Sequence, residues 1–105
     1  MSASKFVVLR GEFVDQRHPA LWAKGGLAVS RGWDARGYTI THVPTCFRVA
    51  KFTAKGPAIS AARAISKLAD WEKVSATRAR HLRGLTKAQR KAIGVELSLW
   101  GAVSK

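Results

Sequence analysis

The hydrophobic pattern of this chain changes its period near Pro57, and this change constrains the fold more than any other feature. Before Pro57, β-branched and aromatic residues form short runs or alternate with polar ones, as they do in strands. After it, apolar residues recur at spacings of three and four, which predicts an amphipathic helix over residues 57–72. These residues are Ala58, Ala61, Ala62, Ile65, Leu68 and Ala69. Strands followed by helices predict an α+β fold, in which a small antiparallel sheet packs against the amphipathic helix.

Three to four strands are expected in the first half of the chain. Residues 5–14 predict the first, and residues 27–31 and 37–43 predict two more. Residues 46–52 alternate between apolar and polar, which predicts a half-buried fourth strand. The link between the last two strands is short and contains Pro44, so they are expected to form a hairpin.

Glycine and proline mark the interruptions of this pattern. Gly11 is expected to form a β-bulge in the first strand. Residues 15–26 contain a proline and a pair of glycines, which predicts a loop with a short helical turn at residues 20–23. Gly56 and Pro57 suit the N-cap and the first residue of the amphipathic helix.

Two further helices are expected after residue 72. A short one, capped by Ser75 or Thr77, is predicted to end at Arg83. Thr86 followed by Gln89 is a capping-box signature, which predicts a final helix that ends near residue 100. In that final helix, the residues predicted to face the core are Ala88, Ala92, Val95 and Leu99.

The length of 105 residues predicts a single domain, because domains usually contain about 100–150 residues. Within residues 1–105, the expected regions are a sheet over 5–52, a helix over 57–72 and a basic helical region over 75–101. No apolar run approaches the roughly 20 residues of a membrane span, and the N-terminal residues lack a signal-peptide pattern. Cys46 is the one cysteine in the chain, which excludes an internal disulfide. These features predict a cytoplasmic protein without a membrane partner.

Charge is the extreme property of the sequence. It contains 19 lysines and arginines against 6 acidic residues, which gives a formal net charge of +13. Such an excess attracts polyanions and also opposes compaction by self-repulsion. A solubilising surface is the alternative interpretation, but solubility alone does not require a threefold imbalance. A nucleic acid, DNA or RNA, is therefore the expected partner.

The densest basic segment extends from residue 73 to residue 91 and contains no acidic residue. Its seven cations, the predicted nucleic-acid-binding residues, are Lys73, Arg78, Arg80, Arg83, Lys87, Arg90 and Lys91. On a final helix, Lys87, Arg90 and Lys91 share one face, so the segment predicts a basic helical ridge that contacts phosphates with low sequence specificity. A solvated helical face without a ligand and a helix-turn-helix are the alternatives.

The sheet offers a second candidate surface. Arg48 and Lys51 are three residues apart in the fourth strand, so a regular strand places them on opposite faces. Only one of them can then share a polar face with Thr39 and Thr41. Arg31 and Arg36 are further candidates for that face, whereas the tryptophans are assigned to packing.

The sequence does not indicate an enzyme. The carboxylates are scattered, and the closest pair, Asp70 and Glu72, does not share a helical face. His42 and Cys46 flank the Pro44 turn and could approach each other, but two ligands do not complete a zinc site. No metal and no cofactor is therefore predicted.

A turn, strands and an alanine-rich helix follow one another in residues 37–45, 52–53 and 58–68. This order resembles small accessory proteins of bacteriophages and mobile elements. It is also similar to the arm-binding domain of tyrosine integrases, which reads DNA with a three-stranded sheet. The resemblance covers residues 27–70, and no functional residue is carried over from it.

The resemblance implies a bacteriophage or mobile-element origin, where small basic proteins bind nucleic acid or disable host machinery, including CRISPR effectors. The alternative function is thus a phage-encoded inhibitor, such as an anti-CRISPR, that docks on an acidic host protein surface or in a nucleic-acid channel. The final helix can pack on its own sheet or on a second copy, which leaves a homodimer open.

Overall fold

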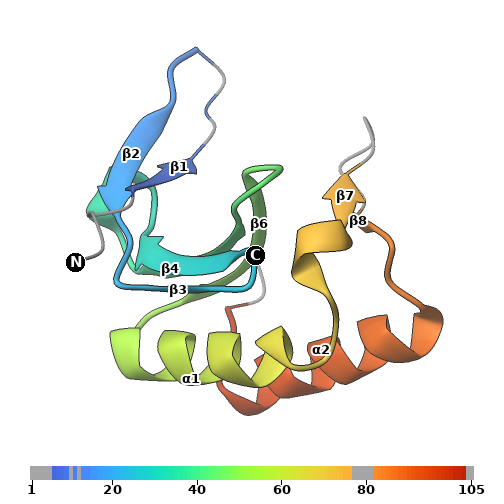
Figure 1. Cartoon of the computed structure of the whole chain (residues 1–105). Coiled ribbons are helices and arrows are strands. Elements are labelled where there is room, and N and C mark those ends of the chain that lie inside the picture. Colours follow the sequence, from blue (N-terminus) through green and yellow to red (C-terminus); the bar gives the residue numbers. More distant parts are fainter. Residues whose placement is uncertain (1–5, 10, 12, 77–81, 104–105) are drawn as a thin grey trace.

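The part of the chain that the structure describes has an α+β fold built from antiparallel sheets and two α-helices (Figure 1). The computed structural model describes residues 6–9, 11, 13–76 and 82–103, and only the backbone of 75–76 and 82–83. In chain order the elements are β1 (Phe6–Leu9), β2 (Gln16–Pro19), β3 (Trp22–Lys24), β4 (Leu27–Arg31), the 3-10 turn η1 (Trp33–Ala35), β5 (Tyr38–His42), β6 (Phe47–Phe52), α1 (Lys55–Ser66), the 3-10 turn η2 (Trp71–Lys73), β7 (Ser75–Ala76), β8 (Leu82–Arg83) and α2 (Lys87–Leu99).

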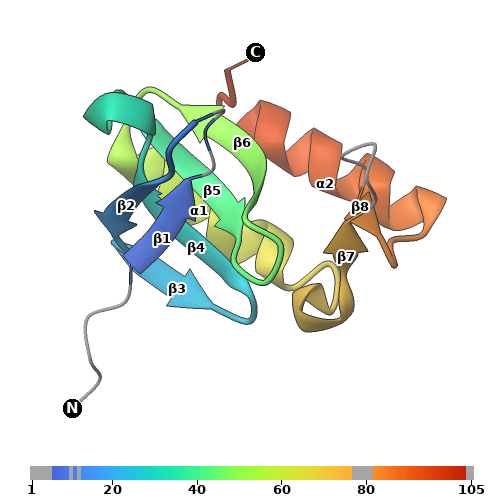
Figure 2. The same cartoon turned by 90° about the horizontal axis from the view of Figure 1, so that it is seen from above.

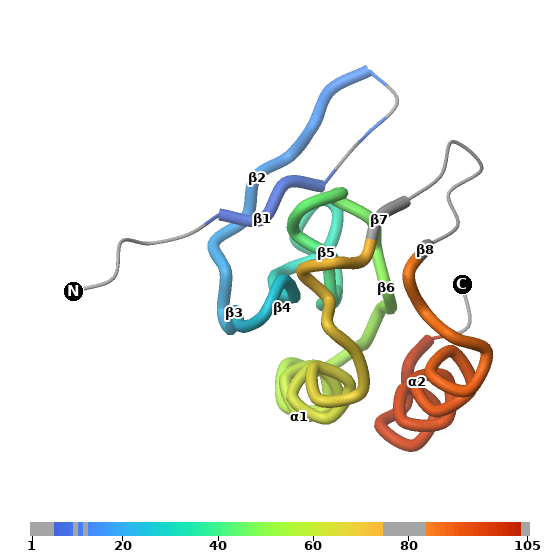
Figure 3. Tube along the Cα trace, turned by 45° about the vertical axis from the view of Figure 1, so that its right-hand side comes forward, coloured from blue at the N-terminus to red at the C-terminus, as the bar shows by residue number. Residues whose placement is uncertain are grey.

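A four-stranded antiparallel sheet of order β3-β4-β5-β6 forms the middle layer. The β1–β2 hairpin lies on one of its faces, and α1 and α2 lie on the other (Figures 1 and 3). Side chains alternate along β4, so Leu27 and Val29 face α1 whereas Ala28 packs on Val7 and Leu9 of β1. Strand β4 is therefore buried on both faces.

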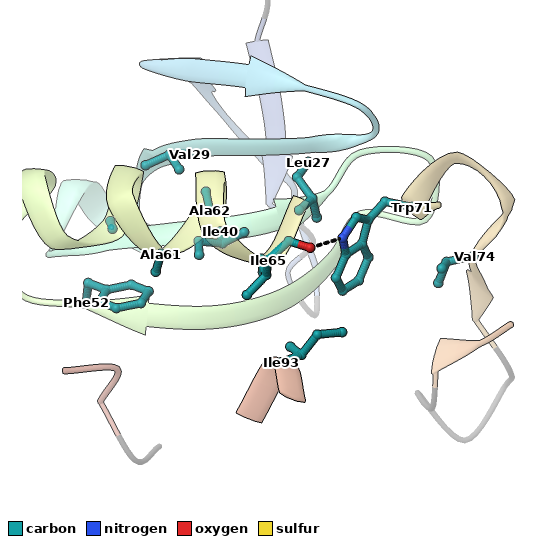
Figure 4. Packing of buried hydrophobic residues seen from close by; sticks show 11 residues of the cluster. Leu27, Val29, Ile40, Phe52, Ala61, Ala62, Ile65, Trp71, Val74 and Ile93 are labelled. Atoms are coloured by element: carbon teal, nitrogen blue, oxygen red, sulfur yellow. Dashed lines mark hydrogen bonds between the residues drawn. The ribbon is translucent and has the colours of Figure 1, made fainter. Parts of the chain in front are cut away.

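The main hydrophobic core lies between the sheet and the helices (Figure 4). Its buried residues are Leu27, Val29, Ile40, Phe52, Ala58, Ala61, Ala62, Ile65, Trp71, Val74 and Ile93. The indole of Trp71 is only 1% exposed, and its Nε1 donates a hydrogen bond of 2.8 Å to the carbonyl of Ile65. This bond joins η2 to the end of α1, so the chain after the helix is fixed on the core.

The loop predicted over residues 15–26 is wrong, because this segment forms β2 and β3. The expected helical turn at residues 20–23 is replaced by the start of β3. Gly25 and Gly26 have φ values of 60° and 93°, which allows a two-residue turn between β3 and β4. Glycine and proline thus mark a tight turn and a strand end here, rather than an irregular loop.

The first strand is also shorter than predicted and ends at Leu9. Gly11 lies beyond it and forms no bulge; a Cβ added there would be 2.2 Å from the Val14 carbonyl oxygen. The irregularity of the sheet lies in β6 instead. Ile40 pairs with Ala50 but Thr41 pairs with Arg48, so one extra residue is inserted between these pairs.

Helix α1 confirms the helix predicted after the sheet, although it covers Lys55–Ser66 rather than residues 57–72. Its N-cap is Ala54 and not Gly56. Pro57 still lies in the first turn, where its missing N–H has no intrahelical partner to lose. The predicted continuation to residue 72 is replaced by η2, which turns Trp71 into the core.

The short helix predicted from Ser75 or Thr77 to Arg83 is wrong. Ser75 pairs with Arg83 and Ala76 with Leu82 in the antiparallel β7–β8 hairpin, and residues 77–81 lie outside the described residues.

The predicted capping box is present at the start of α2, where Thr86 and Gln89 exchange hydrogen bonds of 3.0 and 2.8 Å. The predicted core face of α2 is wrong, however. Ala88 is exposed, and Val95 and Leu99 are 51% and 72% exposed, whereas Ile93 is buried.

Candidate nucleic-acid interface

Helix α2 presents three predicted cations to solvent. Lys87, Arg90 and Lys91 are all exposed, and their spacing places them on one side of the helix. The first turn of α2 carries no acidic residue. The capping box and a hydrogen bond of 3.2 Å from Gln89 Nε2 to the Leu68 carbonyl hold this end of the helix in place. These cations therefore project from a fixed support.

The other C-terminal cations precede α2 in the chain. Lys73 lies in η2, and its Nζ is 3.9 Å from Asp70 Oδ2. Because both side chains are largely exposed, this ion pair contributes little to stability and Lys73 can still meet an anion. Arg83 ends β8, and Arg78 and Arg80 lie outside the described residues. The predicted helical ridge thus becomes a helix face preceded by a hairpin.

The sheet corrects the prediction for Arg48 and Lys51. The extra residue in β6 changes the alternation, so Thr41 pairs with Arg48 and Thr39 pairs with Lys51. Cross-strand partners lie on the same face of a sheet, so both cations share the face that lies away from α1. Sequence spacing alone could not show this, because a bulge depends on how the neighbouring strand pairs.

Arg31 and Arg36 do not join that face. Arg31 pairs with Tyr38 at the end of β4 and donates a hydrogen bond of 2.7 Å to the tyrosine hydroxyl. Arg31 and Tyr38 each lie two residues from Val29 and Ile40 in their own strands, so they share the sheet face of that pair, which is directed toward α1. Arg36 is exposed and follows η1. Arg31 therefore lies on the opposite face of the sheet from Arg48 and Lys51, and Arg36 lies outside the strands.

Two exposed apolar groups were not predicted. At the tip of the β1–β2 hairpin, Phe13 is 90% exposed and Val14 is 66% exposed. On α2, Val95 and Leu99 lie beside the basic side, and Trp100 follows at 42% exposure. The exposure of Phe13 was missed because the strand-like pattern of residues 5–14 predicted that Phe13 belongs to a strand and not to a turn. Nothing in the structure shows what covers the α2 group, so the homodimer stays a prediction.

His42 has a structural role in this fold. It is fully buried; its Nε2 donates to the Trp71 carbonyl, and its Nδ1 lies 2.7 Å from Thr45 Oγ1. Both ring nitrogens are thus engaged between the β5–β6 turn and η2. Cys46 Sγ contacts the Val43 carbonyl at 3.9 Å. Among the described residues, no three histidine, cysteine or acidic side chains are grouped as a metal site would require.

Comparison with known proteins gives no match to a family model, to a curated protein or to a solved structure. Within the described ranges, neither α-helix has the length and apolar character of a membrane span.

Proposed function

We propose that this protein binds nucleic acid through the phosphate backbone, with the basic side of α2 as its main contact. The observation that carries the proposal is the exposure of Lys87, Arg90 and Lys91 on one side of α2, in a chain of net charge +13. The preceding segment adds Lys73 and Arg83 to the same region of the chain.

Cations of this kind hold phosphates by charge and hydrogen bonding, and neither interaction depends on base sequence. Each phosphate that is neutralised releases condensed counterions, so the affinity falls as salt rises. The proposed binding has low sequence specificity for the same reason, and either DNA or RNA satisfies it.

A salt series tests the proposal with single-stranded DNA, duplex DNA and RNA oligonucleotides. The variant is Lys87→Gln/Lys91→Gln, and the matched control is Lys24→Gln/Lys55→Gln, which removes two exposed lysines outside α2. For duplex DNA, the slope of log affinity against log salt should fall by about 1.8 in the variant, since each lost phosphate contact removes about 0.9. The control should change the slope by less than half as much.

Two results would contradict the proposal. Absence of binding at about 50 mM salt excludes a phosphate-binding surface of this charge. Equal losses in the variant and the control would show that the net charge acts diffusely and that α2 is not the contact.

The alternative, an inhibitor that docks on an acidic host protein, is supported by Phe13. A large aromatic side chain that is 90% exposed is a typical anchor for a protein partner. Capture of one defined protein from nuclease-treated host lysate, lost in Phe13→Ala, would favour this function over nucleic-acid binding.

A further inference from the structure

Two buried hydroxyl groups in β5 have no hydrogen-bond partner among the described residues. Thr39 is 3% exposed and Thr41 is 1% exposed, and the Oγ1 atom of each is unpaired. A buried polar group without a partner destabilises a fold, and such groups are few in native proteins. The two hydroxyls lie two residues apart on one face of the four-stranded sheet. Each is therefore able to donate a hydrogen bond to an acceptor from outside the chain.

The neighbours of these hydroxyls are cationic. Thr39 pairs with Lys51 and Thr41 pairs with Arg48, and the bulge in β6 brings both cations to the threonine face. In the part of the chain that the structure describes, neither cation has a side-chain hydrogen bond or an ion pair. Two hydroxyl donors and two positive charges thus lie together without an acceptor.

No carboxylate from the neighbouring strand β4 lies on this face. The residues of β4 in register with Thr39 and Thr41 are Ser30 and Ala28. The hydroxyl of Ser30 is already used, because it donates to the Arg31 carbonyl at 2.9 Å. The β1–β2 hairpin lies on this same face, where it contacts β4 (Figure 2). An anion meets no fixed negative charge from these strands.

We propose that this face of β5 and β6 binds a phosphate group. The hydroxyls of Thr39 and Thr41 donate hydrogen bonds to it, and Arg48 and Lys51 neutralise its charge. Both hydroxyl oxygens are inaccessible in the structure, so the entry of phosphate requires the groups that cover them to move. The proposal rests on the proposed function, because nucleic acid is the polymer that would carry this phosphate group. The site itself is separate, since α2 lies on the opposite side of the sheet (Figure 1).

Inorganic phosphate is the probe for this site. Phosphate replaces chloride during the titration so that the ionic strength stays constant. The amide NMR signals of β5 and β6 report the binding. The wild type should show saturable shifts at Thr41 and Arg48. Thr41→Val keeps the shape of the side chain but removes the donor, and it should weaken phosphate binding about tenfold or more, as expected for a lost hydrogen bond to a charged group.

Arg48→Gln gives a second variant that leaves the buried residues intact, because Arg48 is exposed. It should weaken phosphate binding at Thr41 as well, whereas Lys87→Gln/Lys91→Gln should leave these signals unchanged. The thermal midpoint provides an independent readout. Phosphate should raise it in the wild type and raise it less in Thr41→Val.

Removal of a threonine hydroxyl without loss of phosphate binding would overturn the proposal. If Thr41→Val is more stable than the wild type and responds to phosphate equally, the threonines are merely unpartnered groups. Absence of saturable shifts in the wild type would overturn it too. If these shifts occur but oligonucleotides do not bind, the phosphate site stands and the nucleic-acid function fails.

Discussion

Replacing Gly26 by alanine should destabilise the protein strongly, because Gly26 combines an unusual backbone angle with close packing. Its φ is 93°, and a Cβ added there would lie 3.2 Å from the Trp71 carbonyl carbon and 3.3 Å from the Glu72 nitrogen. Both contacts are backbone atoms of η2, which Trp71 fixes on the core. The chain therefore has little freedom to move away.

Gly25 supplies the matched control. Its φ is 60°, but a Cβ added there meets no atom within 4 Å. A residue other than glycine in this conformation costs about 1–2 kcal/mol, which applies to both positions. Overpacking adds about 1–3 kcal/mol at Gly26 alone. We expect a loss of about 1 kcal/mol for Gly25→Ala and about 3 kcal/mol for Gly26→Ala.

Urea denaturation measures both losses, with tryptophan fluorescence as the probe because Trp71 is buried. The informative quantity is the difference between the two variants, since the common backbone term cancels. Equal losses would refute the reasoning, because they would show that the β3–β4 turn does not press on η2.

Two further predictions concern the β1–β2 hairpin and α2. Gln16 Nε2 donates to Asp34 Oδ1 at 2.7 Å and its Oε1 accepts from the Asp34 backbone at 2.8 Å, so Gln16→Ala should cost about 1–2 kcal/mol. Amide exchange should accelerate in β1 and β2 but not in β6; unchanged exchange would show that these bonds do not hold the hairpin. Leu99 is 72% exposed, so Leu99→Ser should change the free energy of unfolding by about 0.5 kcal/mol or less. A loss above about 2 kcal/mol would place Leu99 in a core or in a dimer interface, which sedimentation would distinguish.

The parts of the fold that the sequence predicted are those set by local pattern. β4, β5 and β6 follow from alternation and β-branched residues, and α1 follows from alanines at spacings of three and four. The capping box at Thr86 and Gln89 is equally local, because both partners lie within one helical turn. Each of these signals depends on residues within a few positions of one another.

The parts that the sequence missed depend on tertiary pairing. Helix α2 carries two apolar stripes, and only the packing on α1 and the sheet decides that Ile93 is buried while Val95 is exposed. The β7–β8 hairpin stands where a helix was predicted, and it depends on the pairing of its two strands with each other. The shared face of Arg48 and Lys51 requires the bulge, which no spacing rule contains.

The two proposed phosphate contacts have a geometric consequence for the nucleic acid. The basic side of α2 and the Thr41–Arg48 face lie on opposite sides of the sheet, in a molecule that measures 33 × 33 × 30 Å. A duplex is stiff over a persistence length of about 150 base pairs, so a short duplex cannot turn around the protein to reach both. A single strand is flexible enough to do so. If both contacts are used at once, one long single strand should bind both surfaces of the same protein. A short duplex should occupy only one surface, so that one protein joins two duplexes into a larger assembly.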